Sequence, residues 1–437
     1  MDHFHFRNGR LCAEDVPVEE IAVRVGTPVY VYSTATLERH YRVFRAAVDD
    51  PGALICYAVK ANANMAVIRT LARLGAGADV VSGGELQCAL AAGVAPERIV
   101  FSGVGKTRDE MAAALMAGVF QINVESEPEL EALAEVAASL GRVAPVALRV
   151  NPDVDAGTHA KITTGRSENK FGIDWTAAPA LLARAAAMPG LSLRGVAVHI
   201  GSQLSDLGPF RQAFQRVRDL VVDLRRAGHA MHTLDLGGGL GIPYGDEAAP
   251  VPSPGQYAEV VRHAVAGLDC RLILEPGRLL VGNAGVLVTR VLYVKAGATR
   301  TFVIVDAAMN DLLRPALYNA RHTVVPVRES SAADAQATTV DLVGPICESG
   351  DCLAAGAALP PLASGDLLAV RTAGAYGAAM ASTYNVRPLV AEVMVNGSDM
   401  AVIAERGTIE SILNRQRLPV WLDDEASAPV PRRAVGE

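Results

Sequence analysis

From Leu54 onward the chain alternates short apolar segments with alanine-rich amphipathic segments, and this alternation constrains the fold more than any other feature. The apolar segments have the length of buried strands, and each strand–helix unit takes about 20 to 45 residues. About eight such units in succession favour an α/β fold closed into a (β/α)8 TIM-type barrel over an open doubly wound sheet. The predicted strands are Leu54–Val59, Asp79–Val81, Ile99–Phe101, Gln121–Val124, Val146–Val150, Gly195–Ile200, Thr233–Leu236 and Arg271–Leu274. The predicted helices include Met65–Leu74, Gly84–Ala92, Arg108–Ala117, Glu127–Leu140, Ala177–Ala187 and Pro209–Ala227.

Polar residues follow the predicted strands at the point where each strand ends. In a barrel these strand ends meet at one rim, which is where barrel enzymes place their chemistry. Residues with purely structural roles would be scattered instead, so the alignment favours a functional site at this rim. The residues are Lys60, Ser82, Ser102, Glu125, Arg149, Asn151, His199, Ser202, Gly237 to Gly239, and Glu275.

The lysine at this rim, Lys60, ends the apolar run Leu54–Val59. Desolvation in an apolar setting lowers the pKa of a lysine, and a neutral amine is what Schiff-base chemistry requires. The alternative is a structural lysine that pairs with a carboxylate or extends its amine to solvent. The other polar residues predicted at the same rim favour the reactive lysine.

After about Leu280 the helix–strand alternation gives way to alternating apolar segments, which predict a mostly β domain. We expect the stretch from Ser330 to Thr339 to be a solvated loop. We also expect residues 423–437, rich in alanine, proline and charge, to form a disordered tail. The predicted strands of this domain are Val286–Val294, Thr301–Val305, Thr338–Val343, Leu367–Thr372 and Glu392–Val395.

Composition narrows the class of protein. Half of the residues are hydrophobic and the net charge is −7, with no basic block, so nucleic acid is not an expected partner. No apolar run is long enough to span a bilayer and no secretory signal is present, so we expect a cytoplasmic protein without a membrane partner. The scattered cysteines predict neither a disulfide framework nor a metal site. They are Cys12, Cys56, Cys88, Cys270, Cys347 and Cys352.

Glycines follow the seventh predicted strand, in the sequence Gly237-Gly238-Gly239-Leu240-Gly241. Such a run is often only a tight turn, but it also lets backbone N–H groups approach a phosphate closely. Its place after strand seven is the usual phosphate site of barrels. The next strand ends in Glu275-Pro276-Gly277-Arg278, which adds a carboxylate, a second turn and a cation.

A phosphate cradle, a lysine and a buried carboxylate on one rim suggest pyridoxal 5'-phosphate as cofactor. In this interpretation Lys60 forms the Schiff base, Glu275 pairs with the pyridine nitrogen, and His199 lies against the ring. A histidine bonded to a backbone carbonyl in the core is the alternative for His199.

The chain also carries motifs of a known family and resembles the fold type III pyridoxal-phosphate-dependent decarboxylases. Two motifs, C-E-S-G-D at Cys347–Asp351 and N-D-L-x-R-P-A-L-Y at Asn310–Tyr318, are typical of the branch that converts meso-2,6-diaminopimelate to L-lysine and carbon dioxide. The matching stretches are Tyr57–Asn62, Asp79–Leu86, Phe101–Thr107, Arg149–Asp153, Asn169–Ile173, His199–Gln203, Leu234–Gly241, Leu274–Arg278, Val305–Tyr318, Gly344–Asp351 and Gly374–Asn385.

The resemblance implies a role for each matching residue. Lys60 and Cys347 would be catalytic, with Cys347 as the acid that protonates the carbanion after carbon dioxide leaves. Cofactor contacts are implied for Lys60, Asp79, Arg149, His199, Ser202, Gly238, Gly239, Glu275, Gly277, Arg278 and Tyr376. Substrate contacts are implied for Arg278, Arg314, Tyr318, Glu348 and Tyr376, with the arginines on the far carboxylate and Glu348 on the far ammonium.

The resemblance also implies the domain arrangement and the assembly. Residues 30–280 would form the cofactor-binding barrel, and residues 1–29 with 281–422 a β-sandwich domain. The chain would form a head-to-tail homodimer in which Cys347 and Glu348 reach the active site of the partner.

Three other functions remain open from the sequence. An amino-acid racemase of the same fold is disfavoured by Glu275, because such racemases usually place an arginine at the pyridine nitrogen. Decarboxylases of ornithine, arginine or carboxynorspermidine differ in the acidic motif and lack the context of Arg314 for a far carboxylate. A cofactor carrier without turnover is disfavoured by the complete set of motifs.

Overall fold

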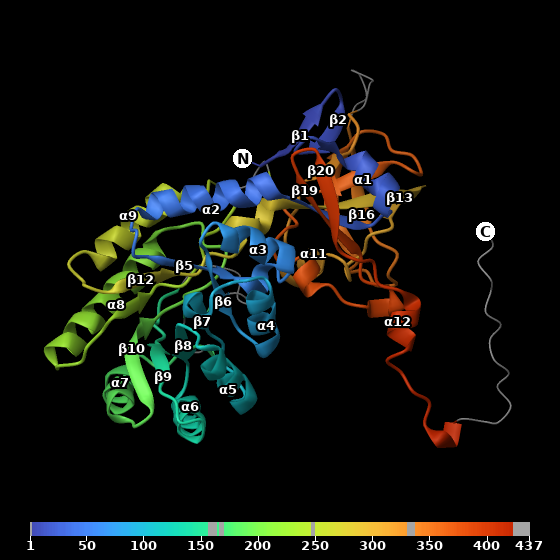
Figure 1. Cartoon of the computed structure of the whole chain (residues 1–437). Coiled ribbons are helices and arrows are strands. Elements are labelled where there is room, and N and C mark those ends of the chain that lie inside the picture. Colours follow the sequence, from blue (N-terminus) through green and yellow to red (C-terminus); the bar gives the residue numbers. More distant parts are fainter. Residues whose placement is uncertain (1, 156–163, 166–169, 246–249, 330–336, 423–437) are drawn as a thin grey trace.

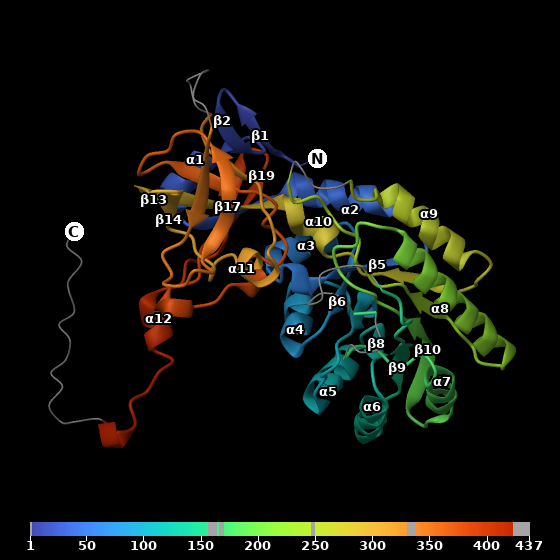
Figure 2. The same ribbon diagram turned by 180° about the vertical axis from the view of Figure 1, so that it is seen from behind.

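The computed structural model describes residues 2–155, 164–165, 170–245, 250–329 and 337–422. Within them the chain forms a barrel and a mostly β domain that pack against each other (Figures 1 and 2). The predicted tail 423–437, residues 330–336 of the predicted loop, and Asn169 of the fifth motif lie outside the described residues. Thr338 and Thr339, where the predicted loop and the predicted strand Thr338–Val343 overlap, belong to the strand.

The eight predicted strands are parallel and close into a barrel in the order β10-β11-β12-β5-β6-β7-β8-β9, which confirms the (β/α)8 fold. Every residue of β5, β6, β7, β8 and β11 is buried, as expected for strands that are covered on both faces. The strands are β5 (Leu54–Ala58), β6 (Gly77–Val80), β7 (Ile99–Phe101), β8 (Gln121–Val124), β9 (Ala144–Arg149), β10 (Leu191–Ala197), β11 (Thr233–Asp235) and β12 (Arg271–Leu274).

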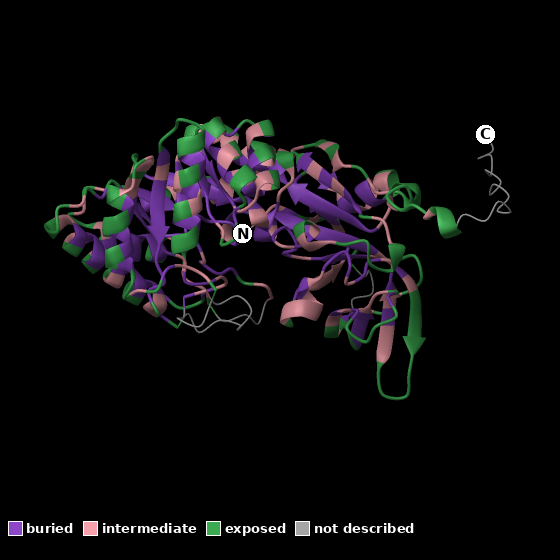
Figure 3. Ribbon diagram, turned by 90° about the horizontal axis from the view of Figure 1, so that it is seen from below, coloured by how far each residue is buried: buried purple, intermediate pink, exposed green. Residues whose placement is uncertain are grey.

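Helices surround the barrel and turn their apolar stripes toward it, so that burial alternates with exposure along each helix (Figure 3). Several begin at a serine or threonine cap. One of these is Ser82, which we had placed among the polar rim residues; its hydroxyl accepts a hydrogen bond from the Glu85 backbone at 3.2 Å and caps α4. The helices are α2 (Thr34–Val48), α3 (Met65–Arg73), α4 (Gly83–Ala91), α5 (Arg108–Ala117), α6 (Glu127–Ser139), α7 (Ala178–Ala187), α8 (Gly208–Arg226), α9 (Pro254–Val265) and α10 (Arg278–Val281).

The second part is the predicted β domain, built mainly on a nine-stranded mixed sheet. Its longest strand, β13 (Gly285–Ala296), pairs with β4, β14 and β18 and thereby holds the sheet together. Two apolar clusters of this domain contain the alternating residues of its strands. The other strands of the sheet are β4 (Val29–Ser33), β14 (Thr301–Val305), β15 (Val324–Pro326), β16 (Thr338–Val343), β17 (Cys352–Leu359), β18 (Leu367–Val370), β19 (Ala391–Asn396) and β20 (Asp399–Ala404).

Shorter elements complete this domain. Strands β1 (Phe4–Arg7), β2 (Arg10–Ala13) and β3 (Val16–Pro17) form a separate three-stranded sheet. The helices are α1 (Val18–Val25), α11 (Arg314–Tyr318) and α12 (Ile409–Leu413). In Figures 1 and 2, α12 and the segment after it extend away from the rest of the chain.

The position of β4 bears on where the boundary between the two domains lies. This strand lies in the nine-stranded sheet, antiparallel to β13 and parallel to β19. We therefore propose that the barrel domain begins after Ser33, with helix α2, rather than at residue 30. Residues 281–422 and the first 33 residues then form the other domain.

The two domains meet at the rim of the barrel beside Lys60. The backbone N–H of Tyr376 donates to the carbonyl of Ala61 at 2.7 Å, and the side-chain amide of Asn62 donates to the carbonyl of Gly374 at 3.3 Å. These bonds fix the segment that follows β18 against the 3₁₀ turn η1 (Val59–Ala61), which carries Lys60. Side chains from the β domain can therefore reach the barrel site.

Two further sequence expectations concern cysteines and membranes. All six cysteines are free thiols. Among the residues described, no helix combines the length and the apolar character needed to cross a bilayer.

The close approach of β10 and β11 gives a test of the barrel. A Cβ atom at Gly195 would lie 1.9 Å from the carbonyl oxygen of Thr233, its neighbour across the two strands. We expect Gly195→Ala to lower the free energy of unfolding by about 1–3 kcal/mol, because the strand backbones would have to separate. Urea unfolding followed by circular dichroism measures this. Gly105→Ala is the control, since a Cβ there meets nothing within 4 Å, and equal losses in both variants would contradict the explanation.

Candidate active site at the rim of the barrel

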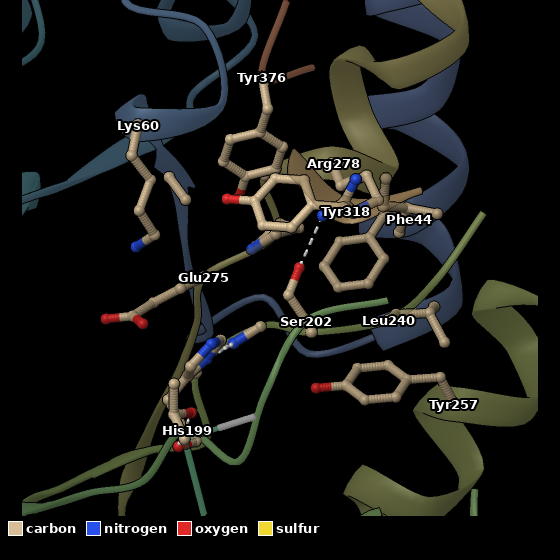
Figure 4. Close-up of a pocket in the computed structure, with 18 residues that line it drawn as sticks. Phe44, Lys60, His199, Ser202, Leu240, Tyr257, Glu275, Arg278, Tyr318 and Tyr376 are labelled. Carbon is tan, nitrogen blue, oxygen red and sulfur yellow. Dashed lines mark hydrogen bonds between the residues drawn. The ribbon is translucent and has the colours of Figure 1, made fainter. Parts of the chain in front are cut away.

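A cavity opens at the carboxyl ends of the barrel strands, where the β domain covers part of the rim. Figure 4 shows Lys60, Glu275 and His199 on one side of this cavity and Phe44, Leu240 and Tyr257 on the other. Ten of the predicted site residues line it: Lys60, His199, Ser202, Gly238, Gly239, Glu275, Gly277, Arg278, Tyr318 and Tyr376. The rim that the sequence predicts is therefore a real convergence of side chains.

Lys60 forms an ion pair with Asp79. The lysine lies in the turn η1 just after β5, and its Nζ donates to Oδ2 of Asp79 at 2.6 Å. Burial by itself would lower the pKa of Lys60, but the negative charges of Asp79 and Glu275 outweigh it, so the pKa is raised above its ordinary value. The expected lowering of this pKa is wrong, because the sequence did not reveal that two buried carboxylates face the amine.

Glu275 ends β12 and is buried on the same side of the cavity. Burial raises its pKa well above the ordinary value, and the nearby negative charges of Asp235 and Asp79 raise it further. Asp235 belongs to the same group of acids, and burial raises its pKa to about 6. Such a group favours a cation or a shared proton at its centre, which is a suitable setting for a bound nitrogen base.

A column of hydrogen bonds inside the barrel ends on these acids. Thr233 donates to Gln121 at 2.7 Å, and Gln121 donates to Asn123 at 2.8 Å. The amide of Asn123 then donates to Asp235 at 2.9 Å and to Ser102 at 3.1 Å. Ser102 in turn donates to Glu275 at 3.4 Å. Every donor in this order points toward a carboxylate, which stabilises negative charge there.

Sequence reasoning missed most of this column. Gln121 and Asn123 alternate along β8, and Thr233 and Asp235 alternate along β11. Two polar residues at a spacing of two on a strand buried on both faces are a detectable signal, because such side chains need partners inside the barrel.

His199 lines the cavity in its neutral form. Burial lowers its pKa well below the ordinary value, and the positive charges of Arg149 and Lys60 lower it further. The backbone N–H of Gly238 donates to Nδ1 at 3.1 Å, so Nδ1 is an acceptor and the ring proton lies on Nε2. The imidazole is therefore fixed as an uncharged ring in the cavity wall, consistent with stacking against a flat ligand.

Arg149 lies behind the cavity wall and does not line it. Its guanidinium pairs with Glu125 at 2.8 Å and donates to the carbonyl oxygen of His199 at 3.4 Å. Glu125 also accepts from the backbone of Gly103 at 3.0 Å. The predicted cofactor residue Arg149 thus acts on the cavity through the position of His199.

The glycines after β11 allow the backbones of neighbouring strand ends to approach more closely than any other residue would permit. A Cβ at Gly238 would lie 2.2 Å from the carbonyl oxygen of Glu275, and one at Gly239 would lie 2.4 Å from that of Gly201. Gly239 also has φ +108°, which disfavours any side chain. Close to these glycines, Ser202 accepts a hydrogen bond from Arg278 at 2.9 Å. Backbone amides, a hydroxyl and a guanidinium together suit a phosphate group.

The arginines beside this cradle have aromatic partners. The guanidinium of Arg278 lies 4.7 Å from the ring of Tyr376, and that of Arg314 lies 4.1 Å from the ring of Tyr244. Both arginines are buried, and within the described part of the chain neither forms an ion pair with a carboxylate. Arg314 does not line the cavity but stands behind it with Tyr244. Buried guanidinium groups without acidic partners favour binding of an anion.

Two predicted residues, unlike Asp79, Arg149 and Arg314, neither line the cavity nor contact a residue that lines it in the described part of the chain. Cys347 and Glu348 are exposed in the loop between β16 and β17, which Asp351 braces by accepting from the backbone of Ile346 at 2.7 Å. Cys347 lies 3.8 Å from the side-chain oxygen of Asn385, and Glu348 accepts a hydrogen bond from the phenol of Tyr384. Both residues are therefore exposed and take no part in the lining of the cavity of their own chain.

The apolar side of the cavity was also missed by the sequence. Phe44 comes from α2 and Tyr257 from α9, with ring centroids 6.2 Å apart, and Leu240 follows the glycines. On a helix, such residues indicate only an apolar stripe packed on the barrel. Nothing in their spacing distinguishes a cavity wall from the core.

Comparisons with known proteins agree with this geometry. A sequence profile described as "Pyridoxal-dependent decarboxylase, pyridoxal binding domain" matches residues 34–282. A diaminopimelate decarboxylase of Pseudomonas aeruginosa is 53% identical over 412 residues, which are 94% of this chain and 98% of the relative.

Solved structures show the same similarity. Diaminopimelate decarboxylase from Helicobacter pylori, complexed with L-lysine, gives a TM-score of 0.87 at 41% identity and covers 91% of this chain and 98% of its own. The enzyme of that name from M. jannaschii, in co-complex with L-lysine, gives a TM-score of 0.91 at 36% identity and covers 96% of this chain and 99% of its own.

The pair of Lys60 and Asp79 gives a test of the site's electrostatics. We expect Asp79→Asn to lower the pKa of Lys60, because the variant removes the nearest negative charge and leaves the burial in place. The measurement is the pH dependence of labelling of Lys60 by an amine-reactive reagent in dialysed protein, with labelled peptides counted by mass spectrometry. The exposed Lys295 is the internal reference. An unchanged ratio of Lys60 to Lys295 labelling at every pH would contradict the assignment.

Proposed function

We propose, from the family to which the chain belongs, that it removes carbon dioxide from meso-2,6-diaminopimelate and releases L-lysine, the last step of lysine biosynthesis. The chain belongs to the pyridoxal-dependent decarboxylases and groups within them with the diaminopimelate decarboxylases. The observation that carries this function is a cavity with Lys60 and Glu275 on one side and, at another, the buried Arg278, which has no acidic partner among the described residues. The first feature suits decarboxylation of an amino acid, and the second suits a substrate with another carboxylate at its far end.

Pyridoxal 5'-phosphate is the cofactor that we propose for this cavity. The glycine cradle, where no Cβ fits, and the pair Ser202 and Arg278 suit its phosphate. Glu275 suits the pyridine nitrogen, and the neutral ring of His199 suits the face of the pyridine. When bound, the cofactor supplies a protonated ring that accepts the electron pair left behind by a departing carboxylate.

The residues of the chain have distinct tasks in this proposal. Lys60 would hold the cofactor through its aldehyde, at the position that the amine of the substrate must reach. Asp79 accepts a hydrogen bond from Lys60 across the 2.6 Å contact and so fixes the direction in which the amine points. Glu275, supported by the hydrogen-bond column through Ser102, keeps the pyridine nitrogen protonated.

The far end of the substrate sets the specificity. We propose that Arg278, Arg314 and Tyr318 hold its carboxylate, because a planar guanidinium can bind a carboxylate through two hydrogen bonds. Fixing this end orients the carboxylate that leaves, which is the contribution of proximity to the rate. The apolar side of the cavity, with Phe44 and Leu240, excludes water from the reacting end.

The proposal includes a homodimer whose active sites are shared. Cys347 and Glu348 do not line the cavity of their own chain and lie exposed in a loop, which leaves them available to a second copy. The phenol of Tyr384 bonds to Glu348 of this loop, and the segment that begins there has exposed apolar side chains at Tyr384, Val386 and Leu389. Such side chains suit an interface. Glu348 would then bind the far ammonium, and Cys347 would deliver the proton. Free thiols at all six cysteines suit a reducing compartment, and we propose the cytoplasm.

Two related activities fit the site less well. A racemase of this fold would need a weaker electron sink than the acid Glu275 provides. A decarboxylase of ornithine, arginine or carboxynorspermidine would have no use for Arg314 as a carboxylate ligand.

The substrate assay tests the function. We expect the purified protein to release carbon dioxide and L-lysine from meso-2,6-diaminopimelate, and to act at least about a hundredfold more slowly on ornithine, arginine and carboxynorspermidine, which leave the buried arginine unpaired. Lys60→Ala should abolish both the turnover and the visible absorbance of the bound cofactor, whereas the exposed Lys295→Ala should change neither. Equal rates on ornithine and diaminopimelate would contradict the assigned substrate.

Mixed dimers test the shared active site. Cys347→Ala alone should turn over slowly but retain the cofactor, and Lys60→Ala alone should be inactive. When the two variants are unfolded together and refolded, half of the dimers are mixed and each has one intact site, so roughly a quarter of the wild-type activity should return. If Cys347 acts within its own chain, the mixture will be no more active than the two variants assayed separately.

A further inference from the structure

The two buried arginines, Arg278 and Arg314, depend on a pair of residues that none of the motifs identified. These are Tyr244, which follows the glycine cradle, and His322, which precedes β15. Tyr244 touches both guanidinium groups, and His322 touches that of Arg314. Since the arginines have no carboxylate partner in the described part of the chain, these contacts, together with those of Arg278 to Ser202 and Tyr376, fix them.

His322 holds Arg314 as a neutral acceptor. Nη1 of Arg314 lies 2.8 Å from Nε2 of His322, and Nδ1 of His322 lies 2.9 Å from the carbonyl oxygen of Arg371. An arginine can only donate and a carbonyl can only accept, so Nδ1 carries the ring proton and Nε2 is free to accept. Burial and the charge of Arg314 lower the pKa of His322 to about 3, so the ring keeps this form at neutral pH.

Tyr244 is placed against both arginines. Its ring centroid lies 4.1 Å from the guanidinium carbon of Arg314 and 5.7 Å from that of Arg278. Its phenol accepts a hydrogen bond from Nη1 of Arg278. The ring also meets that of His322 edge to face, at 5.2 Å between centroids. An aromatic face stabilises a buried guanidinium without neutralising its charge, and so the charge remains available to a ligand.

The pair also crosses the boundary between the domains. Tyr244 belongs to a loop of the barrel, and its carbonyl accepts from the backbone N–H of Thr323 at 3.3 Å in the β domain. The carbonyl of Thr323 accepts from the backbone N–H of Arg371 at 2.8 Å. Arg278 comes from the barrel and Arg314 from the β domain. Their relative position therefore depends on contacts that join the two domains.

We propose that Tyr244 and His322 are positioning residues that align Arg278 and Arg314 as one clamp and thereby determine selectivity for substrates with a far carboxylate. This inference rests on the proposed function, because it assigns the clamp to the far end of that substrate. Neither residue touches the substrate in this scheme. His322 accepts a hydrogen bond from Nη1 of Arg314 and leaves the other N–H donors of that guanidinium to the ligand. Tyr244 keeps the planes of the two guanidinium groups in place.

A purely structural role in the core is the alternative for both residues. It would explain the burial of His322, but not why both ring nitrogens are engaged and one of them accepts from a cation that has no acidic partner in the part of the chain that the structure describes. The two roles also differ in their consequences. A packing defect weakens every ligand of the site, whereas a displaced clamp weakens only ligands that carry the far carboxylate.

The experiment compares two ligands that differ by that carboxylate, L-lysine and 1,5-diaminopentane. Their dissociation constants from the cofactor-bound enzyme are measured through the change in its visible absorbance. We expect His322→Met, which removes the acceptor at similar volume, to weaken L-lysine about tenfold or more and to leave 1,5-diaminopentane within about twofold. His322→Gln, whose side-chain oxygen can accept from Arg314, should bind L-lysine nearly as the wild type does.

Tyr244→Phe is the second variant, and it keeps the ring while removing the bond to Arg278. It should weaken L-lysine alone and raise KM for meso-2,6-diaminopimelate more than it lowers kcat. Equal weakening of both ligands, or unchanged affinity for L-lysine in both His322→Met and Tyr244→Phe, would overturn the proposal. If the wild-type enzyme itself does not distinguish L-lysine from 1,5-diaminopentane and does not use diaminopimelate, the proposed function fails together with the clamp. If the wild-type enzyme distinguishes the two ligands and uses diaminopimelate, and the variants distinguish the two ligands to the same extent, only the clamp fails.

Discussion

The site depends on an excess of buried negative charge around one ammonium group. Asp79, Asp235 and Glu275 lie at the ends of neighbouring or facing strands, and Lys60 is the cation among them. Taking carboxylates out of water is costly, so this arrangement persists only because the hydrogen-bond column and Lys60 compensate it. The same excess makes the cavity receptive to a protonated ring nitrogen. The requirement for folding and the requirement for binding are thus met by the same groups.

At the opposite end of the site the charged groups are arginines, and both domains contribute residues there. Arg278 comes from the barrel, whereas Arg314, Tyr318 and Tyr376 come from the β domain. In the proposed scheme, a barrel alone would hold the cofactor but would lack most of the residues that select the substrate. This division explains why a strand-end motif such as Tyr57–Asn62 indicates the type of chemistry, while residues beyond 300 indicate the molecule on which it acts.

The sequence predicted the barrel well, because strands buried on both faces are apolar throughout and the helices between them begin at clear caps. It predicted the rim residues Lys60, His199 and Glu275 through their positions at strand ends. It failed for the pKa of Lys60, since a pairing such as that with Asp79 is made by neighbouring strands and not by neighbouring residues. It also could not identify Phe44, Tyr244 or His322, whose importance comes only from contacts across the fold.

One topological feature affects how the chain is made. Strand β4 ends at Ser33, yet its hydrogen-bonding partners β13 and β19 begin at Gly285 and Ala391. During synthesis on the ribosome, this early strand must wait with both edges exposed until β13 emerges and with one edge exposed until β19 emerges, while the barrel strands can pair as they appear. Contacts between such distant residues form slowly, and exposed strand edges associate readily. The β domain is therefore the part of the nascent chain in which binding by chaperones would compete with wrong association of exposed strand edges.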